Sequence, residues 1–381
     1  MKVALVLDKF DPSVGGLEKW AYQFSQWLLE AGYEVHVVAF EFSDIYEGAG
    51  IIPHRLQKSF SKLERARIAE KLLRELKVDV IHDTGVGWHF DILNPGTGSK
   101  IANYHQDLKS QTFFLRIRIR ISPYYFRKLR EIRALEQRQY TASPGIFIAK
   151  SRMVQNQMES YYGVDPDRIR LVYPGVDTEQ FSPQHRPSHR GRARKKLDLQ
   201  QEVLFLMACH NFQLKGVRTV LESMRILKNM DKIAHLAIIG LGPIEEYQTL
   251  AKRLGVVEHI HFCGYVDDPV PYFMAADALV HPTFYDACSL VILEAMAAGL
   301  PVITTQFNGA AELITQGIQG FILDDPRDAP QLADKMIILL DESLRNKMGK
   351  EARFLSLNHN LEENFIKIEK IYHSLDRHSS E

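Results

Sequence analysis

The fold class can be inferred from one stretch of the sequence, His281–Thr305, HPTFYDACSLVILEAMAAGLPVITT. The apolar run Ala278–Val280 before it predicts a buried strand. A polar loop follows, then a helix of small and apolar residues that carries Glu294 and stops at Gly299. A second apolar strand is expected at Val302–Thr304. Strand, loop, helix and strand in this order form the repeating unit of a parallel sheet, so the stretch predicts an α/β fold.

Polar groups in this unit are well placed to bind a phosphorylated polyol. The free amides at the start of the helix, around Ser289–Val291, favour an anion. Glu294 can accept two hydrogen bonds from vicinal hydroxyls, as on a ribose, and Asp286 would face another part of the same ligand. Ligands of open α/β sheets bind at the carboxyl ends of strands, where this loop lies. Taken alone, the two acids are better explained as a turn aspartate and an ordinary surface glutamate.

The same residues resemble the donor-binding segment of the retaining glycosyltransferases of family 4. That segment reads Glu-x7-Glu followed by Ala-Met/Ile-Ala-x-Gly-x-Pro-Val, and here the two acids are Asp286, one methylene shorter, and Glu294. The resemblance implies the GT-B architecture, two doubly wound Rossmann-like domains that face each other across a cleft. It implies that Glu294 holds the ribose and Asp286 the sugar hydroxyls of a nucleotide sugar. Further donor contacts are implied at Cys288, Ser289, Leu290 and Val291.

Bulk composition is consistent with two soluble domains. A chain of 381 residues is long for one core. Lys+Arg and Asp+Glu both total 47, so the net charge indicates no partner, nucleic acid included. The three cysteines show no CxxC spacing, which argues against disulfides or zinc and favours a reducing cytosol. The apolar N-terminal run is too short for a signal peptide, and no run is long enough to span a bilayer, so we expect a cytoplasmic protein.

The N-terminal domain, expected over residues 1–176, begins with a strand at Val3–Leu7. Gly15 and Gly16 then precede an amphipathic helix, where glycine lets the backbone approach a ligand. A glycine pair alone is usually only a turn. With Glu18 it forms Gly-Gly-x-Glu, which resembles the family's first-loop motif beside the donor pyrophosphate and the acceptor. Apolar runs predict further strands at residues 35–39, 78–82, 145–149, 169–173, 203–207, 236–240, 260–263 and 321–323.

The loop after the predicted strand 78–82 offers a catalytic candidate, Asp91. Many family members have His-Gly-Gly in this loop, where this chain has Gly96-Thr97-Gly98. A substitute for that histidine is sought among His82, His89 and His105, although a single histidine is more often structural.

Residues 111–140 interleave basic and aromatic side chains. The pattern favours a surface for anionic lipid headgroups or a phosphorylated acceptor. The alternatives are a solvated helix face and a nucleic-acid site, but no known nucleic-acid-binding fold accompanies it. The residues proposed for this surface are Arg116, Arg118, Arg120, Arg127, Lys128 and Arg130.

The second domain is expected at residues 177–358, after the linker Pro174–Asp177, where proline replaces the family's usual asparagine. Its basic start, residues 186–196, is expected to be exposed. Lys215, at a strand-to-helix turn, has the spacing of the family's phosphate lysine. The family usually adds an arginine a few residues before, in a region where this chain has His210 and Leu214, and Arg218 is the alternative source of that contact. Residues 359–381 are expected to cross back to the first domain as a helix. The other donor contacts implied by the resemblance are Gly240, Gly242, Tyr265 and Val266.

The resemblance implies a retaining, metal-independent hexosyltransferase without a cofactor. It would transfer a hexose from a nucleotide-diphosphate sugar to a hydroxyl of a lipid-linked or cell-envelope glycan such as lipopolysaccharide core. The preferred donor is UDP-glucose or a related UDP-hexose. The chain most resembles the lipopolysaccharide-core glucosyltransferase branch, which implies a peripheral site at the cytoplasmic face of the inner membrane. The alternative is a non-catalytic nucleotide-sugar- or membrane-binding scaffold. An epimerase would need a hydrolytic carboxylate constellation that the sequence does not offer, and a phosphorylase would need a pyridoxal-binding lysine.

Overall fold

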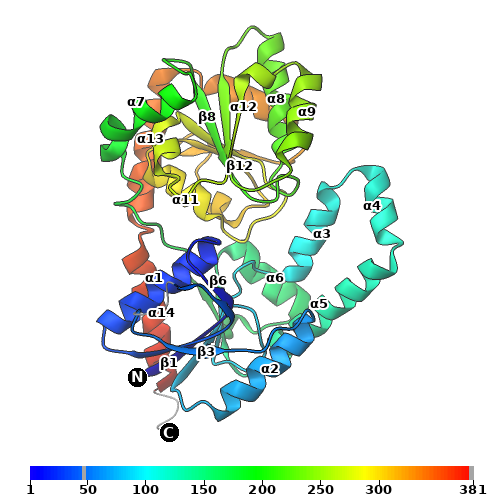
Figure 1. Ribbon diagram of the computed structural model, residues 1–381, viewed down its shortest axis with the longest axis vertical. Helices are drawn as coiled ribbons and strands as arrows, with labels where there is room; N and C mark the ends of the chain where they lie inside the picture. Colours follow the sequence, from blue (N-terminus) through cyan, green and yellow to red (C-terminus); the bar gives the residue numbers. More distant parts are fainter. Residues whose placement is uncertain (45–48, 377–381) are drawn as a thin grey trace. The chain divides into compact units, whose positions relative to one another are not determined.

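The computed structural model describes residues 1–44 and 49–376, which form two compact units (Figure 1). The first comprises residues 1–105, 113–173 and the chain from 364 onward, and the second comprises residues 106–112 and 174–363. The division falls at Tyr173/Pro174, within three residues of the predicted linker boundary. The sequence did not indicate that residues 106–112 group with the second unit. Residues 377–381 of the predicted C-terminal segment lie outside the described residues.

A seven-stranded parallel sheet forms the centre of the first unit. The strand order is β3-β2-β1-β4-β5-β6-β7, so the chain changes direction across the sheet between β1 and β4. β1 and β2 are apolar and almost continuously buried, as expected for strands covered on both faces. The strands are β1 (Lys2–Phe10), β2 (Glu34–Phe42), β3 (Ile52–Arg55), β4 (Val80–Asp83), β5 (Ile92–Leu93), β6 (Ile146–Ala149) and β7 (Ile169–Leu171).

Helices of the first unit pack by amphipathic faces. In α1 the buried residues Trp20, Phe24 and Leu28 recur every four positions. The last helix, α14, belongs to this unit from Asn364 onward: Trp20 Nε1 donates to Asn364 Oδ1 at 3.0 Å. The helices are α1 (Gly16–Glu30), α2 (Lys62–Glu75), α3 (Lys100–Ser110), α4 (Phe113–Arg120), α5 (Pro123–Thr141), α6 (Arg152–Tyr162) and α14 (Leu361–Asp376), and residues 106–110 of α3 group with the second unit.

The second unit has a six-stranded parallel sheet in the order β10-β9-β8-β11-β12-β13. Its first strand, β8, lies between β9 and β11, so the direction of winding reverses between β8 and β11. Such a reversal is where open α/β sheets bind ligands. The strands are β8 (Leu204–Ala208), β9 (His235–Ile239), β10 (Ile260–Gly264), β11 (Ala278–His281), β12 (Val302–Thr305) and β13 (Gly320–Leu323). The helices are α7 (Arg186–Lys196), α8 (Val217–Asn229), α9 (Ile244–Leu254), α10 (Val270–Ala275), α11 (Leu290–Ala297), α12 (Ala329–Ile338) and α13 (Glu342–Leu357).

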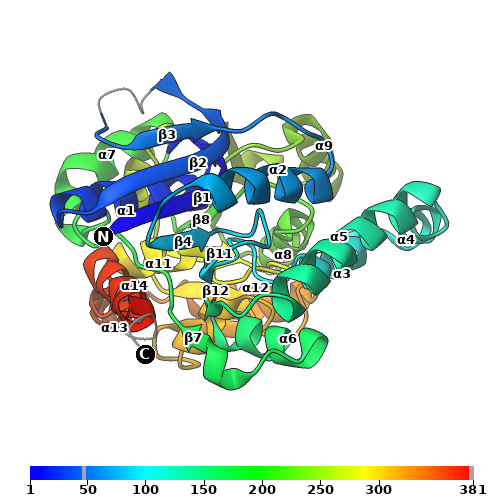
Figure 2. The same cartoon turned by 90° about the horizontal axis from the view of Figure 1, so that it is seen from below.

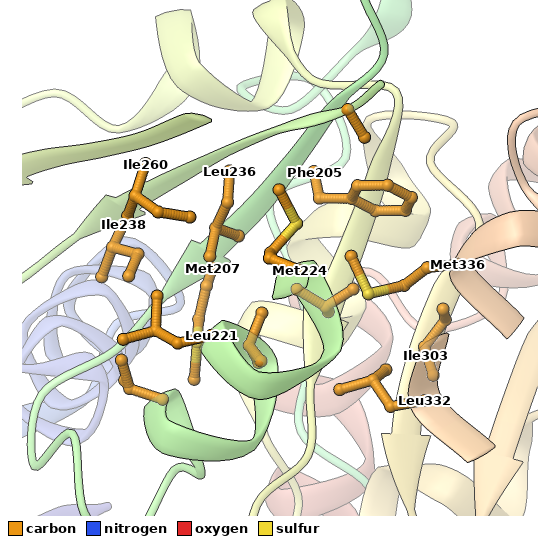
Figure 3. Close-up of a cluster of buried hydrophobic side chains, with 14 of the residues drawn as sticks. Phe205, Met207, Leu221, Met224, Leu236, Ile238, Ile260, Ile303, Leu332 and Met336 are labelled. Carbon is orange, nitrogen blue, oxygen red and sulfur yellow. The ribbon is translucent and has the colours of Figure 1, made fainter. Parts of the chain in front are cut away.

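The core of the second unit lies between one face of this sheet and helices α8 and α12. Every second strand residue points into it, including Phe205 and Met207 of β8 and Leu236 and Ile238 of β9 (Figure 3). Leu221 and Met224 of α8 and Leu332 and Met336 of α12 meet them (Figure 3). This core holds rigid the strands whose carboxyl ends carry the candidate site.

Two strands and one helix differ from the sequence-based expectations. Neither β3 nor β5 was predicted: β3 is an edge strand that contains Pro53, and β5 has only two residues. The basic segment expected to be exposed forms α7, and most of its residues are exposed, but Ala193 and Arg194 are buried, so the expectation fails for these two residues. Arg190 donates to Ala275 O at 2.8 Å and to Asp277 Oδ1 at 2.7 Å, which ties α7 to the end of α10.

The predicted linker packs closely on the start of α14. Val176 N donates to His359 O at 2.9 Å. A Cβ on Gly175 would lie 2.6 Å from Asn360 O, so glycine is required for this approach. Asn364 Nδ2 in turn donates to Tyr173 O at 2.7 Å.

Candidate active site

Two loops meet at the carboxyl ends of β8 and β11. Residues 209–216 connect β8 to α8, and residues 282–289 connect β11 to α11. Phe284 N donates to Leu214 O at 2.8 Å, and Gly216, with φ of 78°, lies against Pro282. The two loops are therefore one packed structure at the reversal point of the sheet.

The central contact of these loops is an ion pair. Lys215 Nζ lies 2.6 Å from Asp286 Oδ2, and it also donates to Tyr285 O at 3.4 Å. The two charged side chains are only 17% and 23% exposed. Burial opposes ionisation of Asp286, but the Lys215 charge and hydrogen bonds from Lys215 and Ser289 outweigh it and hold the pKa of that carboxyl below its ordinary value. The structure thus brings together Lys215 and Asp286, two of the residues predicted to contact the sugar donor.

Helix α11 begins at the same place. Its N-cap residue, Ser289, makes no side-chain hydrogen bond to the first-turn amides, and its own amide donates to Asn308 Oδ1 at 3.1 Å. Leu290 and Val291 are half-buried in the first turn, Cys288 is buried before it, and Glu294 is half-buried in the second turn. The predicted acids therefore flank a helix N-terminus beside a lysine, which suits an anionic ligand.

The turn after β9 fits against the loop after β8. A Cβ on Gly240, where φ is 121°, would lie 2.0 Å from Cys209 O, and one on Gly242 would lie 2.5 Å from the Phe212 ring. Leu241 N donates to Nδ1 of the exposed His210 at 3.0 Å, so the proton of the neutral ring is on Nε2. These glycines have packing roles, and His210 presents an N–H donor beside them.

The turn after β10 joins the same edge of the sheet. Gly240 N donates to Gly264 O at 2.7 Å. Tyr265 follows with 46% of its surface exposed, and Val266 is half-buried. The predicted donor residues of the second unit thus come from the carboxyl ends of four neighbouring strands.

His281 was not predicted as a site residue. It ends β11, is 1% exposed, and neither ring nitrogen has a hydrogen-bond partner among the described residues. Burial and, to a smaller extent, the Lys215 charge lower the pKa of His281 to about 3, against an opposing effect of Asp286. Its position directly after an apolar strand was the available sequence signal.

The predicted residues of the first unit occupy two different ends of its sheet. Gly15 is the N-cap of α1 in an extended conformation, Gly16 is exposed and Glu18 half-buried. Burial raises the pKa of Glu18, an effect that Asp8 reinforces and Lys150 opposes. Lys150, at the carboxyl end of β6, was overlooked although it directly follows an apolar strand, and its Nζ reaches Gly96 O at 3.5 Å.

Asp91 does not lie at the carboxyl ends of the strands, where Glu18 and Lys150 are found. It precedes β5, and its carboxylate accepts a hydrogen bond from Ile81 N at 2.7 Å. It therefore stabilises the amino end of a strand, whereas ligands of such sheets bind at the carboxyl ends. This geometry argues against the catalytic role predicted for Asp91.

His82 is part of the first unit's core. Its Nδ1 lies 2.6 Å from Tyr372 Oη, and burial lowers its pKa to about 3. It is therefore not the sought substitute for the family's loop histidine. His89 and His105 are half-buried, and a side chain at Gly96 would overlap Leu17.

Helix α4 and the start of α5 form the basic and aromatic surface. In both views α4 lies at the end of α5 away from the strands of the first unit (Figures 1 and 2). None of the α4 residues is buried, and Phe114 is 83% exposed. Arg116 lies over the Phe113 ring and Arg127 over the Tyr124 ring. No helix within the described residues is long and apolar enough to cross a bilayer. The other exposed apolar residues of this surface are Phe113, Leu115, Ile117, Ile121, Tyr124 and Phe126.

The part of the chain that the structure describes contains no disulfide between Cys209, Cys263 and Cys288. Within residues 1–44 and 49–376, no three His, Cys, Asp or Glu side chains are grouped to hold a metal ion.

Two family models match the chain over most of its length. The model for glycosyl transferases group 1 matches residues 189–354, and that for Glycosyltransferase Family 4 matches residues 14–180. The chain belongs to these glycosyltransferases, and its two parallel-sheet units have the GT-B fold, so the predicted family and fold are confirmed.

Relatives with assigned names include lipopolysaccharide glucosyltransferase WaaG of Escherichia coli (strain K12). It is 30% identical over 200 residues, which cover 51% of this chain and 53% of WaaG. D-inositol 3-phosphate glycosyltransferase of Corynebacterium glutamicum (strain R) is 28% identical over 238 residues, 58% of this chain and 55% of that protein. The chain thus spans about half the length of the curated relatives it matches.

Solved structures extend the likeness of fold to nearly the whole chain. The crystal structure of WaaG, a glycosyltransferase involved in lipopolysaccharide biosynthesis, has a TM-score of 0.81 at 22% identity and covers 97% of this chain and 99% of that one. Anabaena HepE in complex with UDP-glucose has a TM-score of 0.72 at 16% identity, with coverage of 100% and 99%.

Proposed function

We propose that this protein is a retaining hexosyltransferase that uses a nucleoside diphosphate sugar. The observation that carries the proposal is the convergence of Lys215, Asp286 and the start of α11 at the reversal point of the second sheet. A cation and a helix N-terminus at one place provide two favourable interactions for a diphosphate.

The proposed chemistry is substitution at the anomeric carbon. The bond from that carbon to the diphosphate oxygen breaks, and a bond to the acceptor oxygen forms on the same face. The leaving diphosphate takes the proton of the acceptor hydroxyl. Lys215 and the first-turn amides of α11 stabilise the charge that develops on the leaving group, an electrostatic role that needs no metal ion.

Roles for the other predicted donor residues follow from their positions. Glu294 holds the ribose hydroxyls, and the exposed Nε2 of His210 supplies a donor where the family usually has arginine. Tyr265 and Val266 border the nucleotide base. Gly15, Gly16 and Glu18 keep the role that the family resemblance implies, beside the donor pyrophosphate and the acceptor.

UDP-glucose or a related UDP-hexose is the proposed donor. Support comes from the name of WaaG, a glucosyltransferase, and from HepE, whose structure was solved with UDP-glucose. The C. glutamicum relative, by contrast, is named for D-inositol 3-phosphate.

A glycolipid or other cell-envelope glycan, such as lipopolysaccharide core, is the proposed acceptor. The exposed residues of α4 and the start of α5 support this, because aromatic side chains flanked by arginines suit a bilayer interface rich in anionic lipid. The protein would then bind peripherally at the cytoplasmic face of the inner membrane.

Calorimetric titration with UDP, GDP and ADP, followed by turnover assays with nucleotide sugars, tests the proposal. We expect the protein to bind one of the three diphosphates and to hydrolyse the matching sugar donor slowly. A suitable acceptor should make consumption of that donor faster, because the sugar is then transferred to the acceptor. Binding without turnover across a donor and acceptor panel would instead identify the non-catalytic scaffold. Failure to bind any of the three would refute both.

A further inference from the structure

Asp286 is more firmly engaged than a residue reserved for sugar hydroxyls needs to be. One carboxylate oxygen lies 2.6 Å from Lys215 Nζ, and the Ser289 hydroxyl also hydrogen-bonds the carboxyl group. The backbone is held too, because Asp286 N donates to Phe307 O at 3.0 Å and Gly309 N donates to Asp286 O at 2.9 Å. The carboxylate therefore has little freedom to leave the lysine.

The ion pair has an electrostatic consequence for any diphosphate bound beside it. Both side chains are largely removed from water, so their charges are weakly screened. A diphosphate that contacts Lys215 has to share the ammonium with a neighbouring carboxylate of the same sign. Its affinity is therefore lower than Lys215 and the α11 amides would provide without that carboxylate.

We propose that Asp286 is a positioning residue that acts through Lys215. It holds the ammonium in place for the leaving group, and its negative charge promotes release of the nucleoside diphosphate product. This inference rests on the proposed function. It differs from the sugar-binding role that the family resemblance implies, because it concerns the diphosphate and not the hexose.

The variant Asp286→Asn tests this role, because it keeps the size of the side chain and removes its charge. Its dissociation constant for the diphosphate that the wild type binds should fall by about tenfold. The kcat and the KM for the sugar donor should fall together, and inhibition by the free diphosphate should strengthen by a similar factor. Damage to the fold would instead weaken binding and lower kcat/KM.

Glu258→Gln is the matched control, since it changes the net charge equally. Glu258 is 70% exposed and its nearest cation is Lys228, at 3.9 Å. Unchanged diphosphate affinity is expected for this variant.

A double-mutant cycle shows whether the effect passes through the lysine. In a Lys215→Met background, Asp286→Asn should alter diphosphate affinity much less than it does in the wild type. The same tenfold gain in both backgrounds would overturn the proposal. If Asp286→Asn does not fold, Asp286→Ser removes the same charge and serves in its place.

The remaining outcomes separate this inference from the proposed function. Equal or weaker diphosphate binding by Asp286→Asn, with the wild type binding normally, overturns the inference and leaves the proposed function standing. A raised donor KM with unchanged diphosphate affinity does the same and restores the sugar-binding role. A wild type that binds none of UDP, GDP and ADP refutes both.

Discussion

Gly216 and Pro282 join the two loops of the candidate site at their closest approach. A Cβ on Gly216 would lie 2.3 Å from Pro282 O, and the φ of 78° at Gly216 is itself one that other residues rarely adopt. Lys215 directly precedes this contact, so the position of its ammonium beside Asp286 depends on it.

Gly216→Ala should therefore destabilise the protein and weaken nucleotide binding. The matched control is Gly317→Ala, because Gly317 has the same φ of 78° but nothing within 4 Å of the added Cβ. The unfavourable φ costs both variants about 1–2 kcal/mol, and overlap with Pro282 adds about 1–3 kcal/mol to the first. Urea unfolding measures the difference, and equal losses in the two variants would show that the approach of the loops is unimportant.

Lys215→Met should lower turnover with every sugar donor. Loss of a single electrostatic contact to a developing negative charge typically reduces kcat about 10²–10³-fold. Lys252→Met, which removes an exposed lysine of α9, is the control and should turn over normally. Steady-state assays with several donors check this, and wild-type rates would remove Lys215 from the site.

Glu294→Ala should weaken binding of nucleotides by about 2–3 kcal/mol, because a hydrogen bond to a charged group is lost. Glu351→Ala, on the exposed face of α13, is the control. Calorimetric titration with the preferred nucleotide measures both. If Glu294→Ala binds as tightly as the wild type, the carboxylate does not hold the ribose.

Simultaneous replacement of Arg116, Arg118 and Arg120 by glutamine should reduce sedimentation with anionic vesicles. Each cation near such a surface contributes roughly 1 kcal/mol. The control replaces the three exposed basic residues of α7, Arg192, Lys195 and Lys196, and should sediment normally. Persistent vesicle binding after the α4 substitutions would end the membrane proposal.

Stability should fall as the pH drops below 6.5. Burial lowers the pKa of His82 and of His281 to about 3, so both stay neutral in the folded protein while the unfolded chain takes up protons below 6.5. Each of the two histidines should lower the free energy of unfolding by about 1.4 kcal/mol for every unit by which the pH falls between 6.5 and 3. Asp83 acts in the opposite direction between pH 3.8 and 6, because burial raises its pKa to about 6.

Urea unfolding from pH 7 to pH 5 checks this dependence. His281→Leu should make the dependence shallower by one histidine's contribution. An unchanged pH dependence in that variant would show that His281 is not a buried neutral group.

The sequence was sufficient for the fold wherever the pattern was local and continuous. Apolar runs such as Val3–Leu7 and Ala278–Val280 mark strands because both faces of a parallel strand are buried. It was insufficient for β5, whose two residues pair only because β4 and β6 flank them, and for Arg194, buried through contacts with residues distant in the chain. A two-residue strand and a single arginine in a basic segment carry no local sequence pattern that predicts such long-range contacts.

For the site, the apolar runs of the sequence were enough to assign Lys215 and Asp286 to loops that follow two strands of the second sheet and Glu294 to the helix after the second loop. Only the tertiary structure decided their partners, because the order in which strands pair is not encoded locally. Pairing of β8 with β11 places Lys215 against Asp286, 71 positions away. Pairing of β4 with β5 leaves Asp91 at the amino end of a strand, bonded to Ile81.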